Sequence, residues 1–302
     1  MCGHFALIDT VRGPVHGRLP GRYRWVQALA VLAVVLNHGK SRMPGGFVGV
    51  DVFFVISGFV ICRQLAEQIP EDRFHWNQFL MRRIRRILPL QLVVTAVCLL
   101  VLWFLLLPGE FQRVAEASLS QCLLAVNLYF YRTVDYFGNA AKSQPLLHCW
   151  SLSVEEQFYL FLPACLLLIY RRIASGRVAL MILVGTFGSL LCSELMVRRM
   201  PWGAWYLHPS RTWELLLGCL LALRPLQCSS RICRLLDLIG AASICSSLFL
   251  LSGQSRFPRA AALWPCLGTA LVIVANNGPL QFFGRALATR PFVFIGKISY
   301  SV

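Results

Sequence analysis

Apolar runs of about one membrane thickness, separated by short polar or basic segments, follow one another along most of the chain. A helix needs about 20 consecutive apolar residues to cross the hydrocarbon core of a bilayer, and most of these runs approach that length. The pattern therefore predicts an all-α fold, a polytopic integral membrane helix bundle with eight or nine visible spans. The expected spans cover residues 23–38, 47–63, 87–107, 150–170, 178–197, 212–223, 235–251 and 260–276, and a ninth begins near residue 291.

The first 22 residues lack this pattern. They combine Gly, Pro, Arg and His without periodicity, which predicts a disordered cytoplasmic lead over residues 1–22 before a membrane domain over residues 23–302. The apolar run from Val26 to Leu36 then ends in Asn37 and His38. Because no small-residue cleavage site follows, we interpret this run as a retained first helix rather than a signal peptide.

The composition supports a membrane protein and narrows the expected partners. Hydrophobic residues make up 57% of the chain and charged residues only 14%, which is too much apolar surface for one water-soluble core. The net charge is +16, but the arginines lie between apolar runs, where they set topology and contact anionic lipid. We therefore expect the lipid bilayer as a partner, and no nucleic acid.

The distribution of basic residues favours a cytoplasmic N-terminus. If the sides alternate from a cytoplasmic start, eighteen arginines fall inside and ten Arg or Lys residues fall outside, apart from Lys297 in the last segment. This bias agrees with the positive-inside rule. In this orientation the longest outside loop covers about residues 108–149, where an extracytoplasmic substrate would be received.

The twelve cysteines lie mostly inside apolar runs, where Cys is a small packing residue. The sequence has no CxxC pair and no metal-ligand spacing, so we expect no metal site. A loop disulfide that involves Cys122 or Cys149 stays open.

Polar groups in the first two spans mark the first candidate site, because buried charge in a membrane is costly and is kept mainly for function. His38 closes the first span and is either a base that takes a proton from a hydroxyl or a helix-end side chain that faces interfacial water. Asp51 is expected to orient the His38 ring, to pair with an arginine, or to be an interfacial acid. Ser57 and Gly58 form a small patch where another helix or an acyl chain approaches closely.

A basic cluster, Arg82, Arg83, Arg85 and Arg86, lies at the start of the third span. Guanidinium groups bind phosphates bidentately, so the cluster is a candidate site for a phosphate-bearing molecule. The alternative is a topology anchor that binds anionic lipid headgroups.

The segment WSLSVEEQFY places polar residues at the start of the fourth span. Ser151, Glu155 and Tyr159 are four residues apart, so they share one helix face, close to Trp150. Glu156 is expected to point away from this face, to water.

Further charged and titratable residues lie outside these two candidate sites. His148 is a second candidate base, and Arg211 and Glu214, three residues apart, are expected to form an internal ion pair that makes their charges tolerable in a membrane. The histidines without motif support, which we expect to be solvated or interfacial, are His4, His16, His75 and His208.

Five segments carry a resemblance to a known family. GGFVGVDVFFVISGFVI, RRIRRILP, HCWSLSVEEQFYLFLP, RTWELLLGCLLAL and RPFVFIGKISYS follow one another over residues 23–302. In this order they resemble the acyltransferase-3 family of polytopic membrane O-acyltransferases. The resemblance implies transfer of an acyl group, most often acetyl, from cytoplasmic acyl-CoA to a hydroxyl of an envelope carbohydrate, in the bacterial cytoplasmic membrane. Lipopolysaccharide O-antigen, exopolysaccharide and peptidoglycan are the expected acceptors, and acyl-CoA is a co-substrate rather than a permanent cofactor.

The same resemblance implies roles for single residues. It places the functional histidine at His38 and the usual glutamate at Glu155. In the resulting hypothesis His38 is the base, Asp51 and Glu155 orient groups around it, and the arginine cluster holds the phosphates of the donor.

Two departures from the family pattern stand out. The family usually has an arginine eleven residues before the histidine, within Asp-Gly-Leu-Arg, whereas this chain has Arg24, Trp25, Val26 and Gln27. Gln27 lacks a fixed positive charge, so activity is expected to be weakened unless Arg24 compensates. The chain also stops just as another apolar helix begins, and therefore resembles a family member that is cut short.

Two other functions stay open at this point. One is a transporter or flippase-like carrier of a lipid-linked glycan, which needs a polar pathway but no donor site. The other is a catalytically impaired relative, which Gln27 and the early end of the sequence favour.

Overall fold

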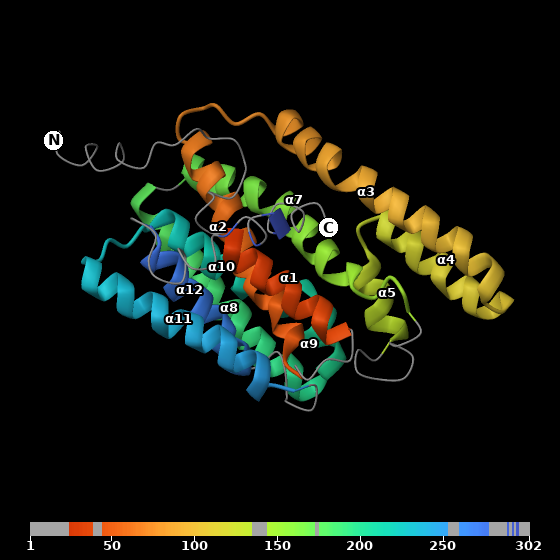
Figure 1. Ribbon diagram of the computed structural model, residues 1–302. Coiled ribbons are helices and arrows are strands. Elements are labelled where there is room, and N and C mark those ends of the chain that lie inside the picture. Colours follow the sequence, from red (N-terminus) through yellow and green to blue (C-terminus); the bar gives the residue numbers. More distant parts are fainter. Residues whose placement is uncertain are drawn as a thin grey trace.

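The computed structural model describes residues 24–38, 44–134, 144–172, 175–252 and 260–277, with the single positions 289, 292, 294 and 295. Regular structure in these residues is helical, which confirms the predicted all-α fold (Figure 1). The helices are α1 (Arg24–His38), α2 (Gly49–Gln68), α3 (Trp76–Leu105), α4 (Pro108–Cys122), α5 (Val126–Thr133), α7 (Cys149–Arg172), α8 (Val178–Arg199), α9 (Pro201–Tyr206), α10 (His208–Leu223), α11 (Ser230–Leu250) and α12 (Leu263–Ala275). Short 3-10 turns cover Gly46–Val48, Ser175–Arg177 and Ala260–Ala262.

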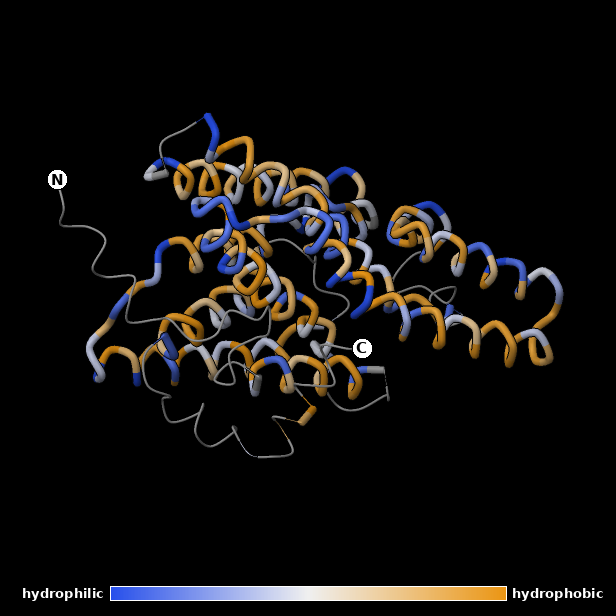
Figure 2. The backbone as a smooth tube through the Cα atoms, turned by 90° about the horizontal axis from the view of Figure 1, so that it is seen from above, coloured by the Kyte–Doolittle hydropathy of each residue, from blue (hydrophilic) through white to orange (hydrophobic). Residues whose placement is uncertain are grey.

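Helices long and apolar enough to cross a membrane make up much of the described chain. By length and composition they are Gly46–Gln68, Trp76–Leu105, Cys149–Arg172, Val178–Arg199 and Ser230–Leu250, beside the shorter apolar helices Trp25–Asn37 and Ala260–Ala275. Several helices carry large apolar side chains on their outer faces, such as Phe104 on α3 and Phe187 on α8. Such a surface suits lipid, because soluble proteins rarely expose contiguous apolar area of this extent. Figure 2 shows these apolar stretches along the outer helices.

The centre of the bundle is the close pair α2 and α10. A Cβ added to Gly58 of α2 would meet the backbone of Leu215, and one added to Gly218 of α10 would meet the backbone of Val55. The Cys219 thiol also donates to the Gly58 carbonyl at 3.5 Å. Small residues let two backbones approach in this way, which confirms the close-approach patch expected at Ser57 and Gly58.

A buried ionic centre lies between the same two helices. The Arg211 guanidinium donates to Asp51 at 2.8 Å and to Glu214 at 2.7 Å, and all three side chains are fully buried. Aromatic rings surround this cation, with centroids 5.4 Å from the guanidinium carbon for Phe54 and Trp150, and 5.6 Å for Trp205. The predicted Arg211–Glu214 pair is thus confirmed, and Asp51 takes the arginine-pairing alternative.

The third helix differs from its prediction at its start. It begins at Trp76 instead of residue 87, so the arginine cluster lies within α3 rather than at its N-terminus. The reason is amphipathic periodicity: Phe79 is buried, Leu80 and Ile87 are half-buried, and these positions continue one helical stripe through the arginines. A search for purely apolar runs cannot detect such a segment.

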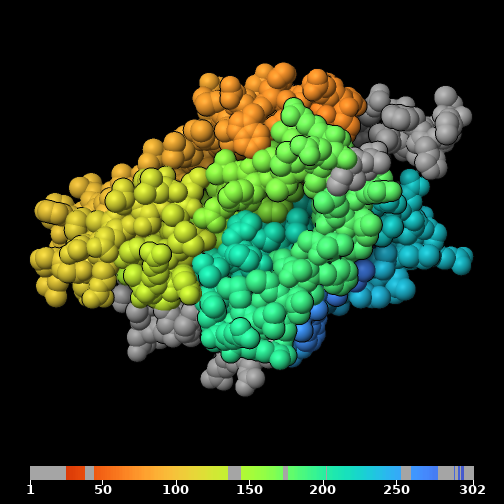
Figure 3. Space-filling view, turned by 180° about the vertical axis from the view of Figure 1, so that it is seen from behind, coloured from red at the N-terminus to blue at the C-terminus, as the bar shows by residue number. Residues whose placement is uncertain are grey.

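The predicted long outside loop contains helices. α4 and α5 occupy residues 108–133, with Pro108 at the first turn of α4, a favourable place for proline. The α3–α4 pair extends from the bundle in both Figures 1 and 2. In the view from behind, this pair lies on one side of α7, and α8, α10 and α11 fill the other side (Figure 3).

The cysteines give one outcome that sequence spacing missed. Cys228 and Cys233 form a disulfide just before and within α11, whereas Cys122 and Cys149 are free thiols. The loop disulfide that the sequence left open for Cys122 or Cys149 is therefore not formed. The predictions for residues 1–22 and for the ninth span fall outside the described residues, apart from three positions of that span.

Candidate active site

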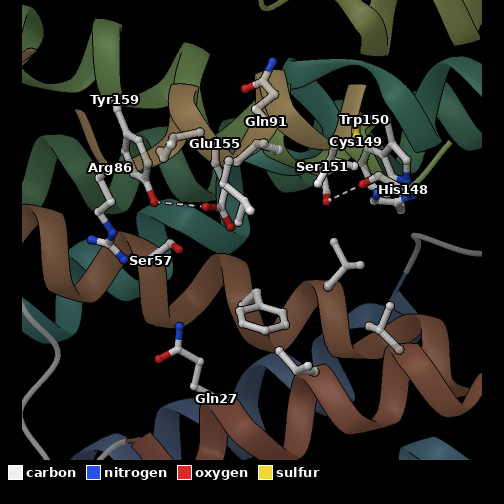
Figure 4. Close-up of a pocket in the computed structure, with 18 of the residues that line it drawn as sticks. Gln27, Ser57, Arg86, Gln91, His148, Cys149, Trp150, Ser151, Glu155 and Tyr159 are labelled. Atoms are coloured by element: carbon white, nitrogen blue, oxygen red, sulfur yellow. Dashed lines mark hydrogen bonds between the residues drawn. The ribbon is translucent and has the colours of Figure 1, made fainter. Parts of the chain in front are cut away.

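A cavity of about 520 Å³ lies between α1, α2, α3 and α7 (Figure 4). Its walls are mostly apolar, with polar side chains at both ends and in the middle. The lining residues are Gln27, Val31, Val34 and Val35 on α1, Val50, Phe53 and Ser57 on α2, Arg83, Arg86, Ile87, Leu90, Gln91, Val94 and Thr95 on α3, and His148, Cys149, Trp150, Ser151, Leu152, Glu155 and Tyr159 at and before the start of α7.

One end of the cavity is basic and rich in hydrogen-bonding groups. Arg86, Tyr159, Ser57 and Gln27 gather there in Figure 4. The Tyr159 hydroxyl donates to Oε2 of Glu155 at 3.0 Å. Gln27 is 3% exposed, and its Oε1 is buried without a hydrogen-bond partner in the described structure. This end can therefore offer both positive charge and a free acceptor to a bound molecule.

The other end is built by the start of α7 and the last turns of α1. Ser151 lines it and donates to the backbone carbonyl of His148 at 3.3 Å, and Val34 and Val35 of α1 face it from across the cavity. α1 ends at His38, three residues after Val35. The side chain of His38, the predicted base, lies outside the described part of the structure, as does that of Arg24.

The stripe predicted on α7 lines this cavity. Ser151, Glu155 and Tyr159 all face it, as their four-residue spacing predicts. Glu156 does not point to water, contrary to the prediction, because it is only 9% exposed. Its carboxylate interacts electrostatically with Arg83 and with Arg86. The correction has a simple cause: α3 covers the face of α7 that a lone helix would leave to solvent.

The arginine cluster divides between two faces of α3. Arg83 and Arg86, three residues apart, line the cavity, while Arg82 and Arg85 are exposed on the opposite side. Of the four arginines predicted to hold the donor, the cavity therefore brings together Arg83 and Arg86. Arg82 and Arg85 suit the alternative of contact with anionic headgroups.

The ionic centre around Arg211 is separate from the cavity. Neither Asp51, Arg211 nor Glu214 lines the cavity wall. Trp150 connects the two regions, because it lines the cavity and also lies 5.4 Å from the guanidinium of Arg211. Asp51 is thus bound to Arg211 and supports the wall of the cavity from behind, rather than facing it beside Glu155.

Three side chains of that centre have metal-ligand chemistry. Ligand atoms of Asp51, Glu214 and Cys266 lie within 4.8 Å of one another, and all three residues are buried. The guanidinium of Arg211 already binds both carboxylates, so a cation occupies the place where a metal would sit. The arrangement is an ion-pair centre.

Sequence reasoning missed two polar residues of the cavity. Gln91 and Thr95 are buried and line it from α3. Nε2 of Gln91 donates to the backbone carbonyl of Gln121 at 3.2 Å, which connects α3 to the end of α4. The available signal was their four-residue spacing inside an otherwise apolar run.

Two of the histidines that the sequence predicts to be solvated or interfacial are described by the structure, and both lie outside the cavity. His75, just before α3, is exposed, in agreement with that expectation. His208 departs from it, because its ring stacks on Phe158 at 6.2 Å and its Nδ1 lies 2.7 Å from the Thr212 hydroxyl. The reason is packing of α7 against the start of α10.

Comparison with known proteins decides the family. A family model described as "Acyltransferase domain" matches residues 22–302. This chain belongs to the acyltransferase-3 family. The resemblance carried by the five sequence segments is thereby confirmed, and the described helices agree with a membrane acyltransferase domain.

Curated relatives share this domain at moderate identity. A Haemophilus influenzae protein described as uncharacterized is 32% identical over 236 residues, which are 74% of this chain and 96% of that protein. The Listeria monocytogenes peptidoglycan O-acetyltransferase OatA is 29% identical over 92% of this chain and 47% of its own. The putative peptidoglycan O-acetyltransferase YrhL of Bacillus subtilis is 28% identical over 95% of this chain and 48% of its own.

The chain spans about half the length of the curated O-acetyltransferases that it matches. No solved structure matches it.

Proposed function

We propose that this acyltransferase moves an acyl group, most simply acetyl, from cytoplasmic acyl-CoA to a hydroxyl of an envelope carbohydrate. The observation that carries the proposal is the cavity between α1, α2, α3 and α7, with two arginines at one end and the α1 terminus at the other. Peptidoglycan is the acceptor that we favour, because OatA and YrhL are described as peptidoglycan O-acetyltransferases.

The dimensions of the cavity support a coenzyme A donor. From Arg83 to Thr95, α3 rises about 18 Å at 1.5 Å per residue. An extended phosphopantetheine arm has about thirteen bonds from phosphorus to sulfur and reaches about 16 Å at roughly 1.2 Å per bond. A donor whose phosphates lie at the arginine end would therefore present its thioester near Ser151 and the end of α1.

The chemistry proposed at the far end uses His38. Helical periodicity puts position 38 on the same face of α1 as Val34 and Val35, which line the cavity. A neutral imidazole there accepts the proton of the acceptor hydroxyl while the oxygen of that hydroxyl attacks the thioester carbonyl. The carbon–sulfur bond then breaks, and the thiolate of coenzyme A leaves and takes up a proton.

The orientation that we propose for the protein in the membrane places the N-terminus in the cytoplasm. The α1 start, the arginine end of α3 and the C-terminus of α7, with Arg171 and Arg172, then all lie on the inner side. That side holds the excess of arginines, as the positive-inside rule requires. The donor enters from the cytoplasm, and only the acyl group passes to the outer end.

The test is acyl transfer by the purified protein from radiolabelled acetyl-CoA to peptidoglycan fragments. His38→Ala should lose at least 100-fold in rate, since general base catalysis contributes about 10²–10⁴-fold. His75→Ala is the matched control, because His75 is exposed and outside the cavity. Unchanged activity in His38→Ala would refute the role of His38 as the general base. Glycan transport without acyl transfer would favour the carrier, and neither activity would favour an impaired relative.

A further inference from the structure

Glu155 carries the only carboxylate among the described residues that line the cavity. Its Oε2 accepts a hydrogen bond from the Tyr159 hydroxyl at 3.0 Å, and Figure 4 shows the carboxylate extending from α7 into the cavity. Ser57 of α2 also interacts with this carboxylate. An ionised carboxylate has about four acceptor sites, so Glu155 can accept a further N–H or O–H group from a bound molecule.

The contacts of Glu155 fix its place along the cavity. The guanidinium carbon of Arg83 lies 4.6 Å from the ring centroid of Tyr159, so the hydrogen-bond partner of Glu155 belongs to the arginine end. Ser151, near which the thioester is proposed to lie, is one turn further along α7 in the other direction, or about 6 Å. Glu155 therefore lies beside the path of the proposed donor, between the phosphates and the thioester.

The opposite wall of the cavity carries a second acceptor. Gln27 of α1 is 3% exposed, and its Oε1 has no hydrogen-bond partner in the described structure. Gln27 and Glu155 come from facing walls in Figure 4. Acceptors on both walls of a mostly apolar cavity suit a ligand that brings its own donors, because a buried acceptor without a partner is costly.

The arm of coenzyme A carries N–H donors at defined places. Counted from phosphorus, the nitrogen of its first amide is about six bonds away and that of its second amide about ten. These paths correspond to about 7 Å and about 12 Å at roughly 1.2 Å per bond. Glu155 is one helical turn, or about 6 Å, from Tyr159 at the arginine end, so its position matches the first amide.

We infer that Glu155 recognises the donor: its carboxylate accepts the hydrogen bond of the pantetheine amide nearer the phosphates. This inference rests on the proposed transfer from acyl-CoA. It gives Glu155 a place in donor binding, whereas the family resemblance placed it among the groups around His38. Tyr159 holds the carboxylate in position for the amide.

Donor analogues that differ by one atom test this contact. Acetyl-CoA is compared with two analogues in which an ester oxygen replaces the N–H of the first or of the second amide. The purified full chain transfers acetyl from each to peptidoglycan fragments. In wild type, loss of the first N–H should lower kcat/KM about tenfold to 100-fold, because a hydrogen bond to a charged group is lost. Loss of the second N–H should change kcat/KM by less than about threefold, because that amide lies beyond the reach of Glu155.

Variants of Glu155 connect this preference to the carboxylate. Glu155→Met removes the acceptor but keeps a side chain of similar length, so its preference for acetyl-CoA over the first ester analogue should fall to within about twofold. Glu155→Gln keeps an acceptor oxygen and a partner for Tyr159. It should retain part of the preference and provides a folded alternative if Glu155→Met is unstable, which thermal unfolding reports. Glu110→Met is the matched control, because Glu110 is exposed on α4 outside the cavity, and it should keep the full preference.

The outcomes separate the inference from the proposed function. Equal kcat/KM of wild type for acetyl-CoA and the first ester analogue would overturn the inference while acyl transfer stands. A preference that Glu155→Met keeps, with an equal loss of rate for every donor, would also overturn it and would place Glu155 among the reacting groups. Absence of acetyl transfer from acetyl-CoA by wild type would instead reject the proposed function.

Discussion

Arg211→Met is the substitution for which the structure gives the sharpest expectation. Methionine keeps a long side chain of similar volume but removes the charge that binds Asp51 and Glu214. All three side chains are fully buried, so two carboxylates would face each other without a counter-charge and out of reach of water.

The cost follows from these contacts. Removing one partner of a buried ion pair destabilises a protein by about 3–5 kcal/mol, because the remaining charge stays buried and uncompensated. The three ring contacts with Phe54, Trp150 and Trp205 are lost as well, at about 0.5–2 kcal/mol each. These terms share one cation and do not simply add, so we expect a loss of about 4 kcal/mol or more.

The assay is reversible unfolding in mixed detergent micelles, followed by tryptophan fluorescence. Trp150 and Trp205 are fully buried beside Arg211 and report on this region directly. A triple variant with Asp51→Asn, Arg211→Met and Glu214→Gln removes the charges together and should recover most of the lost stability. Arg211→Met within 1 kcal/mol of wild type, or a triple variant less stable than the single one, would refute the reasoning.

Two further substitutions test packing and the donor end. Gly58→Ala places a methyl against the backbone of Leu215 and should cost about 1–3 kcal/mol of unfolding free energy. Gly188→Ala is the control, because its methyl meets open space, and it should be neutral or slightly stabilising. Equal effects of both variants in the detergent assay would contradict the close α2–α10 approach. Gln27→Arg adds a positive charge at the arginine end of the cavity and should lower the donor KM several-fold; an unchanged or higher KM for acetyl-CoA would show that position 27 does not face the donor phosphates.

Much of the site could be anticipated from local spacing. Ser151, Glu155 and Tyr159 share a face in any helix, and they line the cavity together. Arg211 and Glu214 pair because three residues bring side chains into reach on one helix. Predictions of this kind depend only on the helical period.

The surroundings of other site residues depend on which helix packs against theirs. Spacing alone could not show that Glu156 is covered by α3, or that Arg83 and Arg86 face the cavity while Arg82 and Arg85 do not. A periodic pattern defines faces of a helix, but it does not say which neighbour each face meets.

The sequence by itself determined that this chain is a basic, all-α membrane protein of the acyltransferase-3 family. Each span must meet the length and polarity that the bilayer requires, so consecutive residues are enough to predict a helical membrane protein. Only the tertiary structure decided that Asp51 binds Arg211, which lies 160 residues later in the chain, instead of facing the cavity. Contacts between distant helices follow from the packing of the whole bundle, and no short segment contains that information.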